Sequence, residues 1–225
     1  DNVATDIDIR TDPEVTGVER ENITYDSSVE GGFKMRGKLA ESWDISKDMS
    51  SVTFKLREGV KSHWDNELTA ADVKWSWERK LALGAIGGFF AGVIGLEKPE
   101  QIQVESKYAV TFKLDKPAPL IFRLHRNPWN NIYDTTKVKE FATSDDPWAK
   151  DWISNNMAGY GPYRMVSLDR GTSFVAKAHK DYWGPKPSID TFIMQEVQSS
   201  AARVQLIQKG TVDIAQFLTP VEIAS

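Results

Sequence analysis

The chain has 225 residues, a formal net charge of -4 and no cysteine, so disulfides, thiolate nucleophiles and cysteine-based metal sites are excluded. The negative net charge gives no electrostatic reason to expect nucleic-acid binding, because proteins that bind nucleic acids present a basic face. Hydrophobic residues make up 40% and charged residues 27%, as in an ordinary globular protein, and no apolar run approaches the roughly 18 residues that span a bilayer.

The first elements are expected near the start of the chain. Residues 2–10 alternate apolar and polar side chains, which predicts a strand. A turn follows at Asp12-Pro13, and a helical start is expected from Glu19 to Val29.

The stretch from Leu39 to Val73 contains three successive features. Residues 39–43 form a short amphipathic piece that ends on a tryptophan, and residues 52–56 alternate as in a half-buried strand. Thr69 then stands three positions before Asp72 and ahead of an apolar run, a pattern typical of a helix N-terminus.

That helix is expected to cover residues 70–83 and to carry Trp75 and Trp77. Positions two apart fall on different faces of a helix, so both rings cannot be buried against the same surface. Residues 84–95 are rich in glycine, which predicts a loop and a buried turn whose backbone can approach a ligand or a strand closely. A phosphate-binding loop is rejected because its Gly-x-x-x-x-Gly-Lys-Ser/Thr pattern is missing.

The second half of the chain is expected to alternate short strands and helices. Alternating patterns and turn residues predict strands over residues 102–105, 109–114, 163–166, 172–178, 189–196 and 212–215. Short helices are expected over residues 120–124, 137–141, 147–153 and 200–208, the last of them ended by Gly210.

Several of these segments together resemble the family 5 extracellular solute-binding proteins, the receptors of dipeptide, oligopeptide and nickel ABC importers. The matching motifs are Leu-Ala-Glu-Ser-Trp at 39–43, Thr-Phe-Lys-Leu-Arg-Glu-Gly-Val-Lys at 53–61, Thr-Ala-Ala-Asp-Val-Lys-Trp-Ser at 69–76, Gly-Tyr-Gly-Pro-Tyr at 159–163, Tyr-Trp within 179–187, and Asp-Ile-Ala at 213–215. One loop departs from the family. Where the family has His-Asp-Gly-x-Pro, this chain has residues 63–67 without the glycine, which leaves the turn type open.

The resemblance implies a fold and a division into subdomains. The implied fold class is α/β, a mixed-sheet α+β lobe of the periplasmic binding protein-like type II fold, with the second lobe absent. Residues 1–28 and 156–225 are expected to form the core subdomain of this lobe, and residues 29–155 an inserted subdomain.

The resemblance also implies where a ligand binds. The family places the turn at Thr16, Gly17 and Val18 near the mouth of its cleft, and uses the loop after Asp-Ile-Ala as a cleft wall, which here is Gln216 and Phe217. Exposed rings suit peptide backbones or sugar faces, and Phe89, Phe90 and Trp129 are further candidates. The alternatives stay open that Gly17 only serves its turn and that residues 216–217 form an ordinary exposed loop.

Binding is favoured over catalysis. The three histidines, His63, His125 and His179, have no metal-ligand spacing, no Gly-x-Ser-x-Gly motif is present, and the carboxylate pairs Asp44/Asp48 and Asp145/Asp146 are expected to be equally solvated. No catalytic residue, metal ligand or cofactor is therefore assigned.

The resemblance then implies the substrate-binding component of an ABC importer, periplasmic or lipid-anchored outside the membrane, and a monomer. Its partners are a peptide or other small-molecule ligand and the permease subunits in the membrane, with oligopeptides as the default cargo. Sugars, opines and metal chelates remain alternatives, as does a stand-alone ligand-sensing or interaction module.

Overall fold

The computed structural model describes residues 24–26, 35–84, 86–118 and 131–224. The predicted strand over residues 2–10, the predicted helix over 120–124, and the site candidates Thr16, Gly17, Val18 and Trp129 lie outside these ranges.

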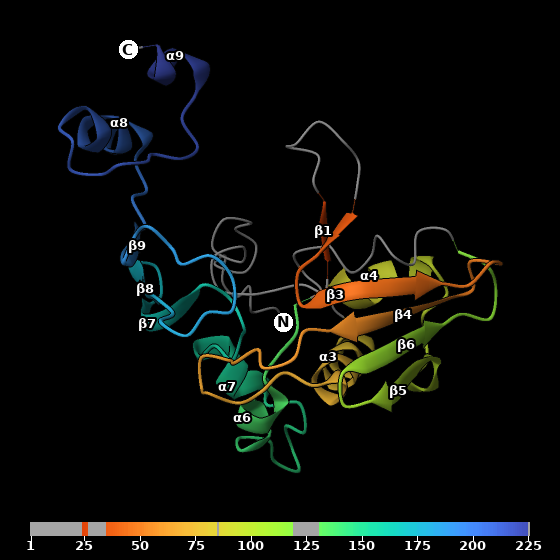
Figure 1. Cartoon of the computed structure of the whole chain (residues 1–225). Helices are drawn as coiled ribbons and strands as arrows, with labels where there is room; N and C mark the ends of the chain where they lie inside the picture. Colours follow the sequence, from red (N-terminus) through yellow and green to blue (C-terminus); the bar gives the residue numbers. More distant parts are fainter. Residues whose placement is uncertain (1–23, 27–34, 85, 119–130, 225) are drawn as a thin grey trace.

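A four-stranded antiparallel sheet forms the centre of the larger half of the molecule (Figure 1). Its strands run in the order β3 (Ala40–Ile45), β4 (Ser51–Leu56), β6 (Ala109–Lys113) and β5 (Ile102–Ser106). The helices α3 (Ala70–Leu83) and α4 (Ile86–Val93) lie next to each other beside it, and the short 3-10 helix η2 (Pro99–Gln101) leads into β5.

The main hydrophobic core lies between this sheet and α3. Phe54 and Phe112 come from neighbouring strands, and Trp77 of α3 packs edge-on against Phe112 with ring centroids 5.5 Å apart. The alternation predicted for residues 52–56 is confirmed, because Val52, Phe54 and Leu56 are buried. Burial of these apolar faces is what makes the strand stable in this register.

Helix α3 begins and ends where the sequence predicts. Thr69 is its N-cap, and the Thr69 backbone N–H donates a hydrogen bond to Asp72 Oδ2 at 2.7 Å. Gly84 ends the helix with a φ of 60°, a left-handed conformation that glycine adopts without steric cost. The two tryptophans separate as expected, because Trp77 joins the main core whereas Trp75 packs in a second cluster with Val138 and Ile153.

Two short helices connect this half to the rest of the chain. They are α6 (Thr135–Lys139) and α7 (Lys150–Asn155). Helix α6 begins two residues earlier than predicted, and α7 begins three residues later. A second antiparallel sheet follows, with the strands β7 (Tyr163–Asp169), β8 (Ser173–Ala178) and β9 (Thr191–Gln195) side by side in that order. Beyond it lie α8 (Ser200–Gln208) and α9 (Pro220–Ile223), at the upper left of Figure 1.

Three predictions of secondary structure are wrong. Residues 86–93 form α4 and not a loop, because Ala91 within the helix and Ile94 just after it bury their side chains in the main core despite the glycines around them. Residues 24–26 form the strand β1, paired antiparallel with β2 (Met35–Gly37), and not part of a helix. Residues 212–215 form no strand among the described residues. A strand needs a hydrogen-bonded neighbour, and Ile214 stays 68% exposed.

Candidate functional site

The two segments that carry the most distinctive motifs dock against each other. The loop of residues 61–67, between β4 and α3, lies on residues 157–161, which lead into β7. The His63 backbone N–H donates to the Gly159 carbonyl at 3.0 Å, and the Trp64 indole Nε1–H donates to the Met157 carbonyl at 2.9 Å. The four-stranded and three-stranded sheets are thus connected through backbone and side-chain hydrogen bonds.

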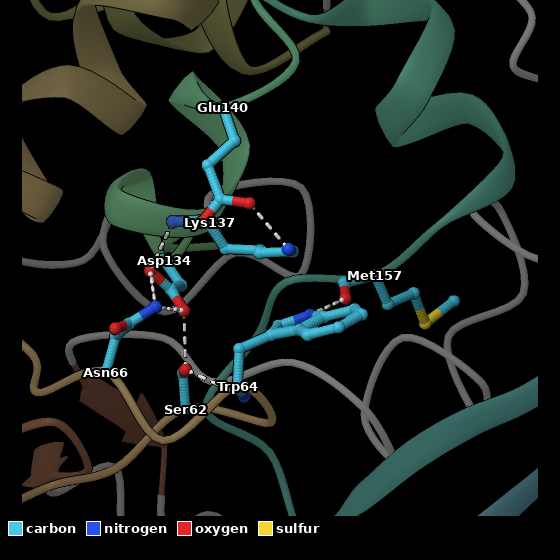
Figure 2. Close-up of polar contacts among 7 residues, drawn as sticks. All are labelled: Ser62, Trp64, Asn66, Asp134, Lys137, Glu140 and Met157. Atoms are coloured by element: carbon cyan, nitrogen blue, oxygen red, sulfur yellow. Dashed lines mark hydrogen bonds and ion pairs between the residues drawn. The ribbon is translucent and has the colours of Figure 1, made fainter.

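The carboxylate of Asp134 joins this loop to the start of α6 (Figure 2). Asp134 is fully buried and accepts hydrogen bonds from the Ser62 hydroxyl at 2.5 Å and from the Asn66 amide at 3.0 Å. It also caps α6 by accepting from the Lys137 backbone N–H at 3.0 Å. A buried carboxylate with this many donors is held in one position, so Asp134 sets the position of the loop relative to α6.

The loop keeps a tight left-handed turn although it lacks the family's glycine. Asp65 stands at the glycine position and has a φ of 63°. Its backbone N–H donates to the Ser62 carbonyl at 3.1 Å, and the Ser62 N–H donates to the Asn66 carbonyl at 2.9 Å. Aspartate tolerates this conformation better than most residues, so the turn survives the substitution.

A cluster of aromatic rings joins the loop of residues 61–67 to the segments around α6 and α7. Phe141 stacks on Trp152 with centroids 4.5 Å apart, and Trp152 lies 6.2 Å from Trp64. The Lys137 ammonium lies 4.5 Å from the centre of the Trp64 ring and forms a 2.6 Å ion pair with Glu140 (Figure 2). These contacts tie α6 and α7 to the loop and involve two of the eight tryptophans of the chain, Trp64 and Trp152.

Glu67 closes the loop at its other end. Its carboxylate accepts from the Lys107 ammonium at 2.8 Å, the Tyr108 hydroxyl at 2.8 Å and the Gly59 backbone N–H at 3.0 Å. The Lys107 hydrogen bond, followed by those from Tyr108 and Gly59, lowers the pKa of Glu67 to about 2. This carboxylate is therefore charged at any physiological pH and serves structure.

The structure brings together two histidines that the sequence gave no reason to pair. His63 and His179 lie 116 positions apart in the chain, yet their rings meet edge to face with centroids 5.2 Å apart. Burial lowers the pKa of His63 to about 4 and also lowers the pKa of His179. Only the fold could reveal this contact, because residue spacing carries no signal for it.

The candidate ligand residues on α4 differ in exposure. Phe89 is 68% exposed, whereas Phe90 is half-buried and packs partly against the main core. Their rings contact each other with centroids 5.6 Å apart. Phe89 thus presents an exposed ring at the surface, and Phe90 packs against it.

Gln216 and Phe217 lie between α8 and α9, well apart from α4 in Figure 1. Gln216 is half-buried, and Phe217 is 86% exposed with a φ of 55°. The Phe217 carbonyl accepts from Arg203 Nη2 at 3.2 Å. A bulky residue in the left-handed region is a conformational outlier, of the kind that concentrates at functional sites.

Within the described ranges no group of three or more histidine, aspartate or glutamate side chains is arranged to hold a metal ion. One hollow is lined by residues 132–133 and 157–159 and holds about 10 Å³, the space of a single water molecule. It cannot enclose a peptide. Nor does any helix of the described part have the length and apolar character required to cross a membrane.

Comparison with known proteins places these features in a family. The profile of the bacterial extracellular solute-binding proteins, family 5 Middle, matches residues 34–225. The probable D,D-dipeptide-binding periplasmic protein DdpA of Escherichia coli K12 is 30% identical over 189 residues, which are 84% of this chain and 35% of that protein. The chain therefore spans about a third of the length of this relative.

Two solved structures share the fold. Haemophilus influenzae OppA in complex with the peptide RPPGFSPFR superimposes with a TM-score of 0.78 at 20% identity, over 94% of this chain and 43% of OppA. AgaA from A. tumefaciens R10 in complex with agropinic acid gives 0.74 at 25% identity, over 91% of this chain and 38% of AgaA. The mixed α/β architecture is that of one lobe of a periplasmic binding protein. The chain belongs to the bacterial extracellular solute-binding proteins, family 5.

Proposed function

We propose that this chain is part of the substrate-binding component of an ABC importer, which captures oligopeptides or similar small solutes and delivers them to a membrane permease. The observation that carries the proposal is the family match over residues 34–225. The 30% identity of the chain to a probable D,D-dipeptide-binding periplasmic protein supports peptides as cargo.

The proposed ligand surface combines aromatic rings with polar groups from several segments of the chain. Phe217 and Gln216 form one part of it, and Phe89 with Phe90 a second part. Thr16, Gly17, Val18 and Trp129 complete the proposed set. Phe217 supports this assignment because it keeps a large apolar ring 86% exposed on a strained backbone, which folding alone does not favour.

The mechanism is capture by closure, with no chemical step. A second lobe supplies the opposite wall of the cleft, and the cargo is gripped through its backbone hydrogen bonds while its side chains occupy hydrated pockets. Closing two lobes around a ligand stabilises the closed state by the contacts that only that state makes. No cofactor, metal or catalytic group is needed.

The proposed setting is the periplasm, or the outer side of the membrane with a lipid anchor, where permease subunits are the partner and the receptor acts as a monomer. The periplasmic relative supports this location. The division of the lobe into residues 1–28 with 156–225 and an insert of 29–155 belongs to the same proposal.

A second cargo class is favoured by one comparison. AgaA binds agropinic acid and is 25% identical to this chain, so an opine or another small polar conjugate is the runner-up. Such an acidic conjugate presents a carboxylate group, which hydrogen-bond donors can recognise. Sugars and metal chelates would require the same kind of surface.

The deciding experiment is native mass spectrometry of the protein purified from its own source without refolding. Adducts spaced by amino-acid residue masses would establish peptide cargo. A single discrete adduct would replace peptides by an opine, sugar or chelate. A bare chain of 25.3 kDa, with no ligand on adding peptide mixtures or opines, would overturn the import function and favour a stand-alone interaction module.

A further inference from the structure

The contact between His63 and His179 lies where the two sheets meet. His63 belongs to the loop that leaves the four-stranded sheet, and His179 follows β8 of the three-stranded sheet. Both side chains are buried, at 9% and 6% exposure. The His63 N–H donates to Gly159, and the His179 N–H donates to the Pro162 carbonyl at 2.7 Å. Both backbones are therefore fixed against the same short segment, residues 159–162.

The geometry determines where the proton of His63 resides. Its Nε2 lies 3.0 Å from the Gly161 carbonyl oxygen. A carbonyl only accepts hydrogen bonds, so Nε2 must carry the hydrogen and Nδ1 is the unprotonated nitrogen. Among the described residues, neither Nδ1 of His63 nor Nδ1 of His179 has a hydrogen-bond partner, and both atoms are buried. A doubly protonated ring carries a hydrogen on both nitrogens, so protonation of either histidine would leave a buried Nδ1–H without an acceptor among the described residues, together with a buried positive charge.

The charges around the pair act unequally on the two rings. Arg164 of β7 opposes protonation of both, whereas Asp181 and Asp65 favour protonation of His179. A proton on His179 in turn opposes one on His63. His179 is therefore the ring that accepts a proton first, and burial is the main cost that it must overcome.

We propose that the His63–His179 pair is an acid-sensitive contact, which holds the loop of residues 61–67 against residues 159–162 when both rings are neutral and opens when His179 and then His63 gain a proton. The open state hydrates both imidazoles and gives each new N–H a water acceptor. Tyr160 of this segment belongs to the main core, but the other residues of both cores lie outside the contact, so the sheets themselves stay folded. This proposal is independent of the cargo.

The sign of the pH effect follows from proton linkage. A histidine in the open loop has a pKa of about 6.5, and in the closed contact burial lowers the pKa, for His63 to about 4. The open state therefore binds more protons between these two values. The closed contact is complete above about pH 6.5 and is lost as the pH falls toward about 4, by up to about tenfold in the opening equilibrium per pH unit for each histidine.

The test is amide hydrogen exchange of the full chain, followed by NMR between about pH 7.5 and about pH 5 and corrected for intrinsic exchange rates. The backbone amides of residues 63 and 179 report the contact, and those of β4 and β6 report the four-stranded sheet. Below about pH 6.5 the wild type should progressively lose protection at residues 63 and 179, with protection of the sheet unchanged. Equal loss at all these amides, or none, would overturn the proposal.

Variants separate the two rings. His179→Asn should reduce the slope to about tenfold per pH unit or less, and the double variant His63→Gln with His179→Asn should abolish it. Lys180→Asn, an exposed neighbour, is the matched control and should keep the wild-type slope. A double variant with the wild-type slope contradicts the idea.

A measurement on the unmodified chain covers the case in which these variants do not fold. Imidazole nitrogen NMR should show that His63 in the closed contact is neutral at about pH 5.5, with its hydrogen on Nε2. The proposal would also be overturned if both rings titrate at about pH 6.5 while the amides of residues 63 and 179 stay protected.

Discussion

The Ser62 hydroxyl donates a 2.5 Å hydrogen bond to Asp134 Oδ2, although 72 positions separate the two residues. Both are fully buried. Ser62 also accepts from the Trp64 backbone N–H at 3.0 Å, so one hydroxyl connects the turn of the loop to the cap of α6. This pair connects the loop after β4 to α6, two segments that lie far apart in the sequence.

Replacing Asp134 should destabilise the whole chain. Asp134→Ala removes the acceptor of the Ser62 hydroxyl, the Asn66 amide and the Lys137 N–H, and buried donors without partners are costly. We expect a loss of about 3 kcal/mol in the free energy of unfolding, measured by urea denaturation. Asp145→Ala, at an exposed carboxylate, is the control and should stay within about 0.5 kcal/mol. Similar values for both variants would show that Asp134 has no special role.

The parts of the fold that the sequence predicts are those with a local cause. The strand around Phe54 follows from alternation over five residues, and α3 follows from Thr69, Asp72 and Gly84 at its two ends. The segment 212–215 has the same local alternation but no neighbouring strand among the described residues, and it stays irregular. Alternation measures only whether a segment suits a sheet, whereas pairing is decided by the rest of the chain.

Two glycines of the helical region should respond oppositely to alanine. An added Cβ meets nothing within 4 Å at either Gly84 or Gly92, but Gly84 has a φ of 60° and Gly92 lies in α4. Gly84→Ala should cost about 1 kcal/mol, because the left-handed conformation is unfavourable with a Cβ. Gly92→Ala should stabilise by up to about 1 kcal/mol through helix propensity. Thermal unfolding measures both, and equal signs would contradict the assignment.

Asp65 offers a direct test of the turn that replaces the family's glycine. Its φ of 63° should make Asp65→Gly neutral or slightly stabilising, whereas Asp65→Ala should cost about 1 kcal/mol. The free energy of unfolding should be measured at about pH 8, because His179 is then neutral and its ring has no charge that Asp65 could attract. An alanine variant as stable as the glycine variant would mean that the backbone conformation costs nothing.

The ion pair of Glu67 should show its own pH dependence, on the acid side of the histidine effect. The pKa of Glu67 is lowered from 4.5 to about 2 by Lys107, Tyr108 and Gly59. Because the charged form is stabilised in the folded state, its contribution is present above pH 4.5 and is lost as the pH falls toward about 2. The urea midpoints of wild type and Glu67→Gln should therefore differ most at neutral pH and converge in acid. Added salt should shrink the difference, since the group is exposed.

The candidate site was harder to predict than the fold because its parts are non-local. The resemblance predicts Gln216 and Phe217 as ligand residues from one motif, and the structure adds that Phe217 has a strained backbone and an exposed ring. The His63–His179 contact had no sequence signal at all, because edge-to-face rings can come from any two positions that the fold brings together. Asp134 was missed for the same reason, since its donors Ser62 and Asn66 lie far away in the chain.

Phe217 is the residue on which the proposed binding site can be tested most cleanly. Its side chain is 86% exposed, so Phe217→Ala should leave the free energy of unfolding within about 0.5 kcal/mol of the wild type. If its ring lies against the cargo, the variant should weaken the affinity for the ligand found by native mass spectrometry by about ten- to a hundredfold in titration calorimetry. Val221→Ala is a matched control, at an apolar side chain 80% exposed in the neighbouring α9, and should keep the wild-type affinity. Equal affinities for all three proteins would remove Phe217 from the site, and equal losses in both variants would indicate that the whole segment after α8 has moved.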